Sequence, residues 1–156
     1  MRDTLLIASA GAGKTFELVK RAINQTEKTL ITTFTTENEK EIIKIIHKLN
    51  HGVIPHHITV QTWFSFLLEH GVKPFQGCLT SRDITGLHLV NQKSGVNYRN
   101  KKGFPVFFKE TDVDHHFFNQ KYEIYSDKIS KFSLECNKQS NGNVFTRLEK
   151  IYQYIS

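Results

Sequence analysis

The sequence predicts an α/β fold built around a parallel β-sheet with helices on both sides. Short apolar strands alternate with amphipathic helices over residues 1–72, and the first of these strands runs into a Gly-rich turn. Strands separated by helices need crossover connections, which favour a parallel sheet. The periodicity is lost over 73–143 and returns over 144–156. We therefore expect an α/β portion (1–72), an inserted subdomain (73–143) and a helix leading back to the sheet (144–156).

The first elements follow from local signals. Residues 4–9 are expected to form a strand, and helical spacing then begins at Lys14 and continues to Asn24. Residues 30–34, rich in Ile and Thr, predict the second strand. Thr36 and Glu39 have the spacing of a capping box and should open a second helix.

Later elements are less regular. Asn50 and Gly52 are expected to end the second helix. A third strand is predicted over 58–61, and Thr62 is suited to cap a third helix that Gly71 and Pro74 end. Further strands are expected at 87–90, 106–108 and 122–125, a short helix at 127–134, and helical spacing from 144 to 155.

Composition narrows the class of protein. The chain has 156 residues, 38% of them hydrophobic and 23% charged, which excludes a disordered tail, a fibre and a membrane bundle. Two cysteines cannot form a disulfide framework, so a cytoplasmic location is expected. The net charge of +6 favours a polyanionic partner only weakly.

The strongest motif is a phosphate-binding loop. Small residues let backbone N–H groups surround phosphates, and the following helix adds its positive end. Lys14 would reach the β- and γ-phosphates, and the Thr15 hydroxyl would complete the magnesium shell, so both are the candidate catalytic residues. The expected ATP-binding residues are Ala8, Ser9, Ala10, Gly11, Ala12, Gly13, Lys14 and Thr15. A Gly-rich turn without a ligand is the alternative interpretation.

Three motifs in order resemble superfamily 1 DNA helicases of the UvrD/Rep kind. The loop with Ala8 at its first position resembles that family's phosphate loop. Residues 32–42, beginning T-T-F-T-T, resemble its motif Ia, and residues 61–66, Q-T-W-F-S-F, resemble its motif Ib. The resemblance implies a RecA-like P-loop fold, with ATP and magnesium at residues 8–15.

The resemblance also implies a role in DNA repair or phage defence. The full protein would be an ATP hydrolase that moves along single-stranded DNA and unwinds duplexes at junctions with single strands. Phe34 would stack on a base and Thr35 would bind a phosphate, while Thr62 and Trp63 would touch the next stretch of the strand. A place in the core is the alternative interpretation for Phe34 and the favoured one for Trp63.

The chain also departs from this family. Phe64 stands where motif Ib commonly has His, and only seven residues precede Ala8, so the family's Gln motif for adenine is missing. No apolar run followed by Asp-Glu is present, so we expect an N-terminal fragment that stops before the Walker B strand. The alternatives are a non-catalytic ATP-binding module docked on a nuclease or on a repair or defence partner, a small phosphotransferase, and an inactive remnant.

Other groupings carry weaker expectations. Asp112, Asp114, His115 and His116 suggest a metal site only weakly, and a solvated loop is the favoured interpretation. A basic and aromatic cluster is formed by Tyr98, Arg99, Lys101, Lys102 and Phe104. It is compatible with DNA contact or with a plain surface loop. Neither Cys78 nor Cys136 has the partners of a catalytic nucleophile.

Overall fold

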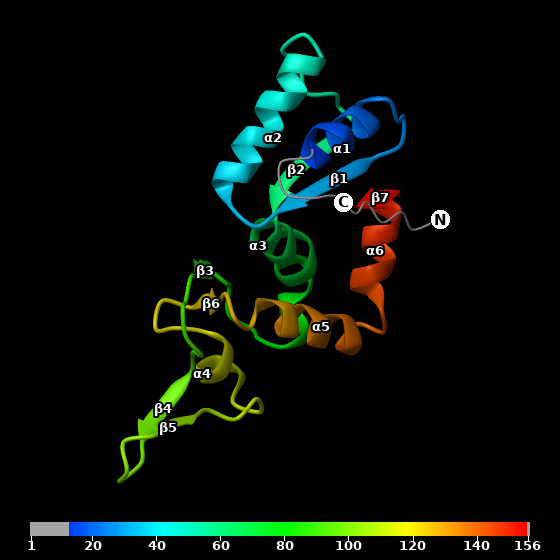
Figure 1. Cartoon of the computed structure of the whole chain (residues 1–156). Coiled ribbons are helices and arrows are strands. Elements are labelled where there is room, and N and C mark those ends of the chain that lie inside the picture. The colour runs from blue at the N-terminus through cyan, green and yellow to red at the C-terminus, as the bar shows by residue number, and fades with distance from the viewer. Residues whose placement is uncertain (1–12, 156) are drawn as a thin grey trace. The chain divides into compact units, whose positions relative to one another are not determined.

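A computed structural model describes residues 13–155 of the chain (Figure 1). The chain folds into two compact units. Unit 1 comprises Met1–Thr62 with Ile151–Ser156, and unit 2 comprises Trp63–Lys150. Unit 2 is therefore inserted in unit 1 along the chain. It begins at Trp63, whereas the sequence analysis expects the boundary after residue 72.

The described part of unit 1 contains a small parallel sheet, so the chain is a mixed α/β protein. The sheet has the order β2-β1-β7, with β1 (Thr29–Thr33) between β2 (Ile58–Thr62) and β7 (Tyr154–Ile155). Thr29 pairs with Ile58 on one side and with Tyr154 on the other. The expected strand at residues 4–9 lies outside the described residues.

One hydrophobic core holds unit 1 together. Helices α1 (Lys14–Ile23) and α2 (Thr36–Leu49) both contribute to it, since each has an apolar stripe at helical spacing. The buried members of this core are Val19, Ala22, Ile31, Ile42, Ile46 and Ile58. Helices α1 and α2 thus both cover the face of the sheet that carries Ile31, whereas the sequence analysis expects helices on both faces.

The start of α2 corrects one detail of the sequence analysis. Thr35, not Thr36, is the N-cap: its backbone is extended, and its Oγ1 accepts a hydrogen bond from the Asn38 N–H at 3.2 Å. The cap therefore lies one residue earlier than the capping-box pattern predicts. The other end is as expected, with Asn50 as C-cap and Gly52 at φ 83°.

Unit 2 is made of short elements. The third helix is only one turn of α-helix, because the backbone changes to π-helix and then to 3₁₀-helix as the chain approaches Pro74. The elements are α3 (Trp63–Phe66), π-helix η1 (Leu67–Val72), 3₁₀-helix η2 (Lys73–Cys78), β3 (Gly86–His88), β4 (Val96–Arg99), β5 (Pro105–Phe107), α4 (Val113–Phe117), β6 (Glu123–Tyr125), α5 (Ile129–Gln139) and α6 (Asn143–Ile151).

Aromatic rings form the centre of the unit 2 core. Phe132 of α5 is fully buried and meets Phe117 and Phe118 edge-on, with ring centroids 5.2 and 5.4 Å away. The π-helix η1 packs closely on α5 through Gly71. A Cβ placed on Gly71 would lie 2.2 Å from Ser133 Oγ, so any other residue at this position would require Ser133 or the backbone to move.

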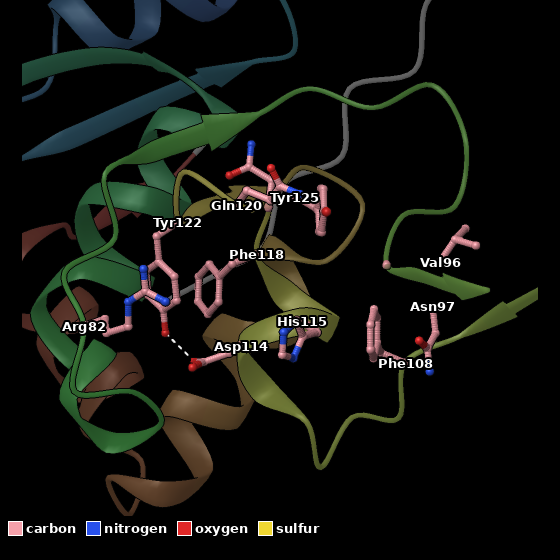
Figure 2. A pocket seen from close by; sticks show the side chains of 12 residues that line it. Arg82, Val96, Asn97, Phe108, Asp114, His115, Phe118, Gln120, Tyr122 and Tyr125 are labelled. Atoms are coloured by element: carbon pink, nitrogen blue, oxygen red, sulfur yellow. Dashed lines mark hydrogen bonds between the residues drawn. The ribbon is translucent and has the colours of Figure 1, made fainter.

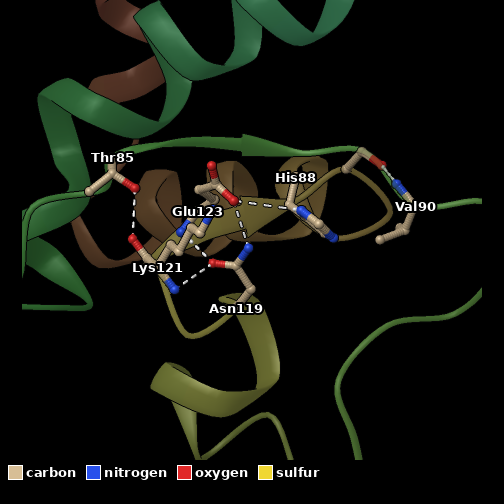
Figure 3. Close-up of polar contacts among 7 residues, drawn as sticks. Thr85, His88, Val90, Asn119, Lys121 and Glu123 are labelled. Atoms are coloured by element: carbon tan, nitrogen blue, oxygen red, sulfur yellow. Dashed lines mark hydrogen bonds and ion pairs between the residues drawn. The ribbon is translucent and has the colours of Figure 1, made fainter.

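Strands β3 and β6 are joined by side-chain contacts as well as by their parallel pairing (Figure 3). The Glu123 carboxylate accepts a hydrogen bond from Asn119 Nδ2 at 2.6 Å and lies 3.6 Å from His88 Nδ1. The Thr85 hydroxyl donates to the Lys121 carbonyl at 2.8 Å. These contacts stabilise a two-stranded sheet that would be marginal alone.

The end of the chain differs from its expected helix. The helix α6 ends at Ile151, and Tyr152 is buried instead of continuing the helical face. The Lys28 N–H donates to Gln153 Oε1 at 3.1 Å, and this hydrogen bond leads the chain into β7. Within the part of the chain that the structure describes, no helix has the length and apolar character needed to cross a membrane.

Candidate functional site

The described part of the predicted phosphate loop lies at the start of α1. Gly13 adopts the left-handed conformation, with φ 75° and ψ 18°, which glycine enters at little cost. The Glu17 N–H then donates to the Gly13 carbonyl at 3.0 Å and begins the helix. Lys14 and Thr15 are exposed in the first turn, where a helix presents backbone N–H groups and positive partial charge. Ala8, Ser9, Ala10, Gly11 and Ala12 lie outside the described residues.

The residues expected to meet DNA follow the carboxyl ends of β1 and β2. Thr33 pairs with Thr62, so both strands end at the same edge of the sheet. Phe34 follows Thr33 with 73% of its surface exposed, which places its ring in solvent and not in the core. Thr35 comes next, and its hydroxyl oxygen is already the cap of α2. The structure thus places Phe34 and Thr35 beside the edge at which β2 also ends.

The other two expected DNA contacts are less accessible. Thr62 is buried at the end of β2. Trp63 is half-buried and is the first residue of unit 2, where its ring centroid lies 5.5 Å from that of the buried Phe66. Of the four side chains, the structure therefore exposes those of Phe34 and Thr35.

The Asp and His residues at 112–116 form a short helix, α4, and not a solvated loop. Asp112 is its N-cap and contacts His115 Nδ1 at 2.8 Å, and this hydrogen bond lowers the pKa of the Asp112 carboxyl. Asp114 instead accepts a hydrogen bond from the Tyr122 hydroxyl at 2.6 Å, and His116 is buried with its Nδ1 2.9 Å from the Phe108 carbonyl. Between residues 13 and 155, no three such side chains are grouped as metal ligands would be.

The two cysteines differ in accessibility. Cys78 is exposed, whereas Cys136 is buried in α5. Burial raises the pKa of the Cys136 thiol to about 12, so the sulfur stays protonated at neutral pH. A protonated, buried thiol is not a nucleophile, which agrees with the expectation from the sequence.

A cavity of about 480 Å³ in unit 2 was missed by the sequence analysis (Figure 2). Four aromatic residues line it: Phe108, Phe118, Tyr122 and Tyr125. Val96 and Asn97 of β4 form another part of its wall. The lining residues come from β4, α4, β6 and their connecting segments, together with Arg82 from the segment before β3, so no single sequence motif indicates the cavity.

Tyr122 is the most constrained residue of this cavity. Its φ is 61°, a left-handed conformation that is rare for a bulky side chain. Figure 2 shows its ring between Arg82 and Phe118: the Phe118 ring is stacked at 4.3 Å and the Arg82 guanidinium carbon lies 3.9 Å from the ring centroid. Burial, followed by the hydrogen bond to Asp114, raises the pKa of the Tyr122 phenol, which therefore remains a donor.

The base of β4 is fixed by a buried lysine. Lys128 Nζ donates to the carbonyls of Ser94 and His116 at 3.0 and 2.7 Å. The Ser94 hydroxyl also donates to Asp127 at 2.6 Å. Burial lowers the pKa of the Lys128 ammonium, and these acceptors replace part of its hydration. The segment that enters β4, and with it one wall of the cavity, is therefore held firmly.

The predicted basic and aromatic cluster is a two-stranded ribbon formed by β4 and β5. Tyr98 and Phe104 are 57% and 63% exposed, and Arg99, Lys101 and Lys102 are exposed too. The connecting turn is well defined, because Asn100 Oδ1 accepts hydrogen bonds from the N–H groups of Lys102 and Phe104. All four residues of β4 are exposed, so this ribbon packs little of its own surface.

Comparison with protein-family models, with curated proteins and with solved structures finds no match to this chain.

Proposed function

We propose that this chain is the ATP-binding N-terminal region of a UvrD-like DNA helicase with a RecA-like fold. In the full protein, ATP hydrolysis would drive movement along single-stranded DNA and duplex unwinding. The observation that carries the proposal is the start of α1. A left-handed Gly13 precedes exposed Lys14 and Thr15 at a helix N-terminus, in a parallel α/β unit. A helix N-terminus of this kind suits a phosphate group, because its N–H groups and positive partial charge attract anions.

The sheet supports the same proposal. Phe34 lies beyond the carboxyl end of β1 with most of its surface exposed, and an exposed aromatic ring can stack on a base. After α6, the chain returns to the sheet and adds β7 in parallel to β1, on the side opposite β2. The resemblance calls for such a return before its Walker B strand.

ATP and Mg²⁺ are the ligands that this proposal needs. Lys14 would bind the terminal phosphates, and the Thr15 hydroxyl would be a magnesium ligand. Hydrolysis also needs an acidic residue beside the loop, and in this sequence neither β1 nor β2 is followed directly by one. We therefore expect this chain alone to bind ATP weakly and to hydrolyse it negligibly, in a cytoplasmic setting.

The test measures binding of a fluorescent ATP analogue with Mg²⁺ to the whole chain. Lys14→Ala should abolish binding, because the point charge on the phosphates is lost. Lys20→Ala is the matched control, since it removes an exposed lysine from the other end of the same helix. Equal binding by all three proteins, or equal loss in both variants, would refute a phosphate site at Lys14.

A non-catalytic ATP-binding module docked on a nuclease or repair partner is the second candidate, favoured by the same lack of an acid directly after β1 and β2. The two candidates differ in their response to DNA. In the protein isolated from its own cells, helicase function predicts ATP hydrolysis that single-stranded DNA stimulates and that Phe34→Ala weakens. A docking module predicts no DNA-stimulated hydrolysis, with or without Phe34.

A further inference from the structure

The β4–β5 ribbon and the segments that flank it are rich in positive charge. Residues 84–109 contain five Lys or Arg residues and no Asp or Glu, in a protein whose net charge is +6. Arg99, Lys101 and Lys102 lie at and beside the turn of the ribbon, where all three are exposed. Like charges gathered on an exposed hairpin repel one another, and a polyanion would relieve that repulsion.

The ribbon also carries exposed rings. Tyr98 and Phe104 lie on either side of the cationic turn, with more than half of each side chain exposed. Exposed aromatic side chains beside cations suit nucleic acid better than other polyanions, because every base offers a face for stacking.

The cavity at the foot of the ribbon offers the chemistry that an unpaired base requires. Its wall includes Asn97 and Gln120, whose amide side chains can both donate and accept hydrogen bonds, as base edges do. Phe108 and His115 are stacked on each other at the cavity, with ring centroids 4.9 Å apart.

Fixed contacts keep the cavity in shape. The Arg82 guanidinium already covers the Tyr122 ring, which leaves that face closed to a cationic ligand. The acidic groups nearby are engaged as well: Asp114 by the Tyr122 hydroxyl and Asp112 by His115. The cavity thus favours a neutral polar ring such as a base, while the cationic ribbon favours the phosphates of the same nucleic acid strand.

We propose that unit 2 binds an unpaired segment of nucleic acid, with phosphates along the β4–β5 ribbon and one base in the cavity at its foot. The inference does not depend on the nucleotide site at Lys14 or on Phe34. Because Val96 and Asn97 belong both to the cavity wall and to β4, the proposed phosphate and base contacts would be continuous along this strand.

The test measures anisotropy of a labelled single-stranded oligonucleotide with the full chain, in the absence of ATP. Replacing Arg99, Lys101 and Lys102 together by Ala should weaken binding and reduce the slope of log K against log salt by about 2, since each phosphate contact contributes about 0.7 for single strands. The control replaces Lys40, Lys44 and Lys48 on the exposed side of α2, an equal change of charge. Equal loss in both triple variants would overturn the proposal.

A separate substitution tests the role of the cavity. Val96→Trp places a large side chain at the cavity wall and should weaken oligonucleotide binding about tenfold, the effect of losing one bound base. Leu89→Trp, at a residue that is exposed outside the cavity, should leave binding unchanged. An oligonucleotide of abasic sites keeps the phosphates without the bases, so Val96→Trp should not affect its binding.

The other possible outcomes also decide whether the proposal holds. If Val96→Trp weakens the abasic probe as much as the normal one, or weakens neither, no base enters the cavity. If a duplex or polyglutamate competes as well as single-stranded DNA, the ribbon is a nonspecific cationic surface and the proposal fails. Repeating the series with Phe34→Ala separates this surface from the sheet edge of unit 1, and the effects of the ribbon and cavity variants should persist there.

Discussion

Arg147 of α6 lies with its Nη1 3.2 Å from Nδ1 of His70 in η1. A guanidinium can only donate, so this nitrogen must be the unprotonated one and the ring proton resides on Nε2. His70 is buried, and burial is the main reason that the pKa of its ring is lowered from its ordinary value of 6.5. The contact between η1 and α6 therefore requires neutral histidine.

This contact predicts that the protein loses stability in mild acid. Unfolded His70 takes up a proton as the pH falls through 6.5, whereas the folded ring resists it, so the unfolded state binds more protons and is favoured. The contribution of neutral His70 to the free energy of unfolding is fully present above pH 6.5 and declines below it. Urea unfolding at pH 7.5 and at pH 5.5 measures the decline. His70→Gln keeps an acceptor for Arg147 without titrating and should make the decline smaller; an unchanged decline would contradict this role.

The close approach of η1 and α5 predicts a steric effect at Gly71. Gly71→Ala should destabilise the protein by about 1–3 kcal/mol, because its Cβ would overlap Ser133 Oγ in a packed interior. Gly77→Ala is the control, since its Cβ would meet open space. Thermal unfolding measures both, and adding Ser133→Gly to Gly71→Ala should restore part of the loss. Full stability of Gly71→Ala would show that η1 does not approach α5 so closely.

Magnesium should strengthen nucleotide binding through Thr15. If its hydroxyl is a metal ligand, chelation of Mg²⁺ weakens binding of ATP to the original chain, and Thr15→Ala binds ATP with little response to Mg²⁺. Thr15→Ser retains the hydroxyl and should retain the response. Titration calorimetry with and without chelator provides the measurement, and an undiminished magnesium response in Thr15→Ala would remove Thr15 from the metal site.

The exposed ring beyond β1 predicts a separable DNA contact. Phe34→Ala should weaken single-stranded DNA binding by about 1–3 kcal/mol, the usual value of one base–aromatic stack. Nucleotide binding and the unfolding temperature should stay constant, because the ring is 73% exposed and is not part of the core. Phe145→Ala, an exposed phenylalanine of unit 2, is the matched control. A large loss of stability in Phe34→Ala would instead assign the ring to packing.

The sequence predicts the structure best where one local signal decides it. The helix beginning at Lys14 is correctly predicted because its apolar residues repeat at helical spacing, and the first described sheet strand follows from a run of Ile and Thr. The cap of α2 is predicted one residue late, since Thr35 and Thr36 are both suitable and only the backbone conformation of Thr35 distinguishes them.

Unit 2 is harder to predict because its structure depends on contacts between distant residues. The Tyr122 backbone belongs to a local turn, in which its N–H donates to the Asn119 carbonyl at 3.0 Å, but its ring is covered by Arg82, which is distant in the sequence. For the same reason, no local pattern indicates that α4 and β6 enclose a cavity. Ile155 falls on the helical spacing that begins at Val144, yet Tyr154 and Ile155 form a strand that pairs with β1.

The pairing of Thr29 with Tyr154 bears on the order in which the chain folds. Residues 63–150 are continuous, so unit 2 can form from local and medium-range contacts while synthesis proceeds. Strand β7 is made after unit 2 and pairs with β1, which precedes unit 2 in the sequence. Folding unit 2 first shortens the effective loop that this pairing closes, which lowers its entropic cost. On the ribosome, β1 and β2 would therefore lack this neighbouring strand until residues 154–155 emerge.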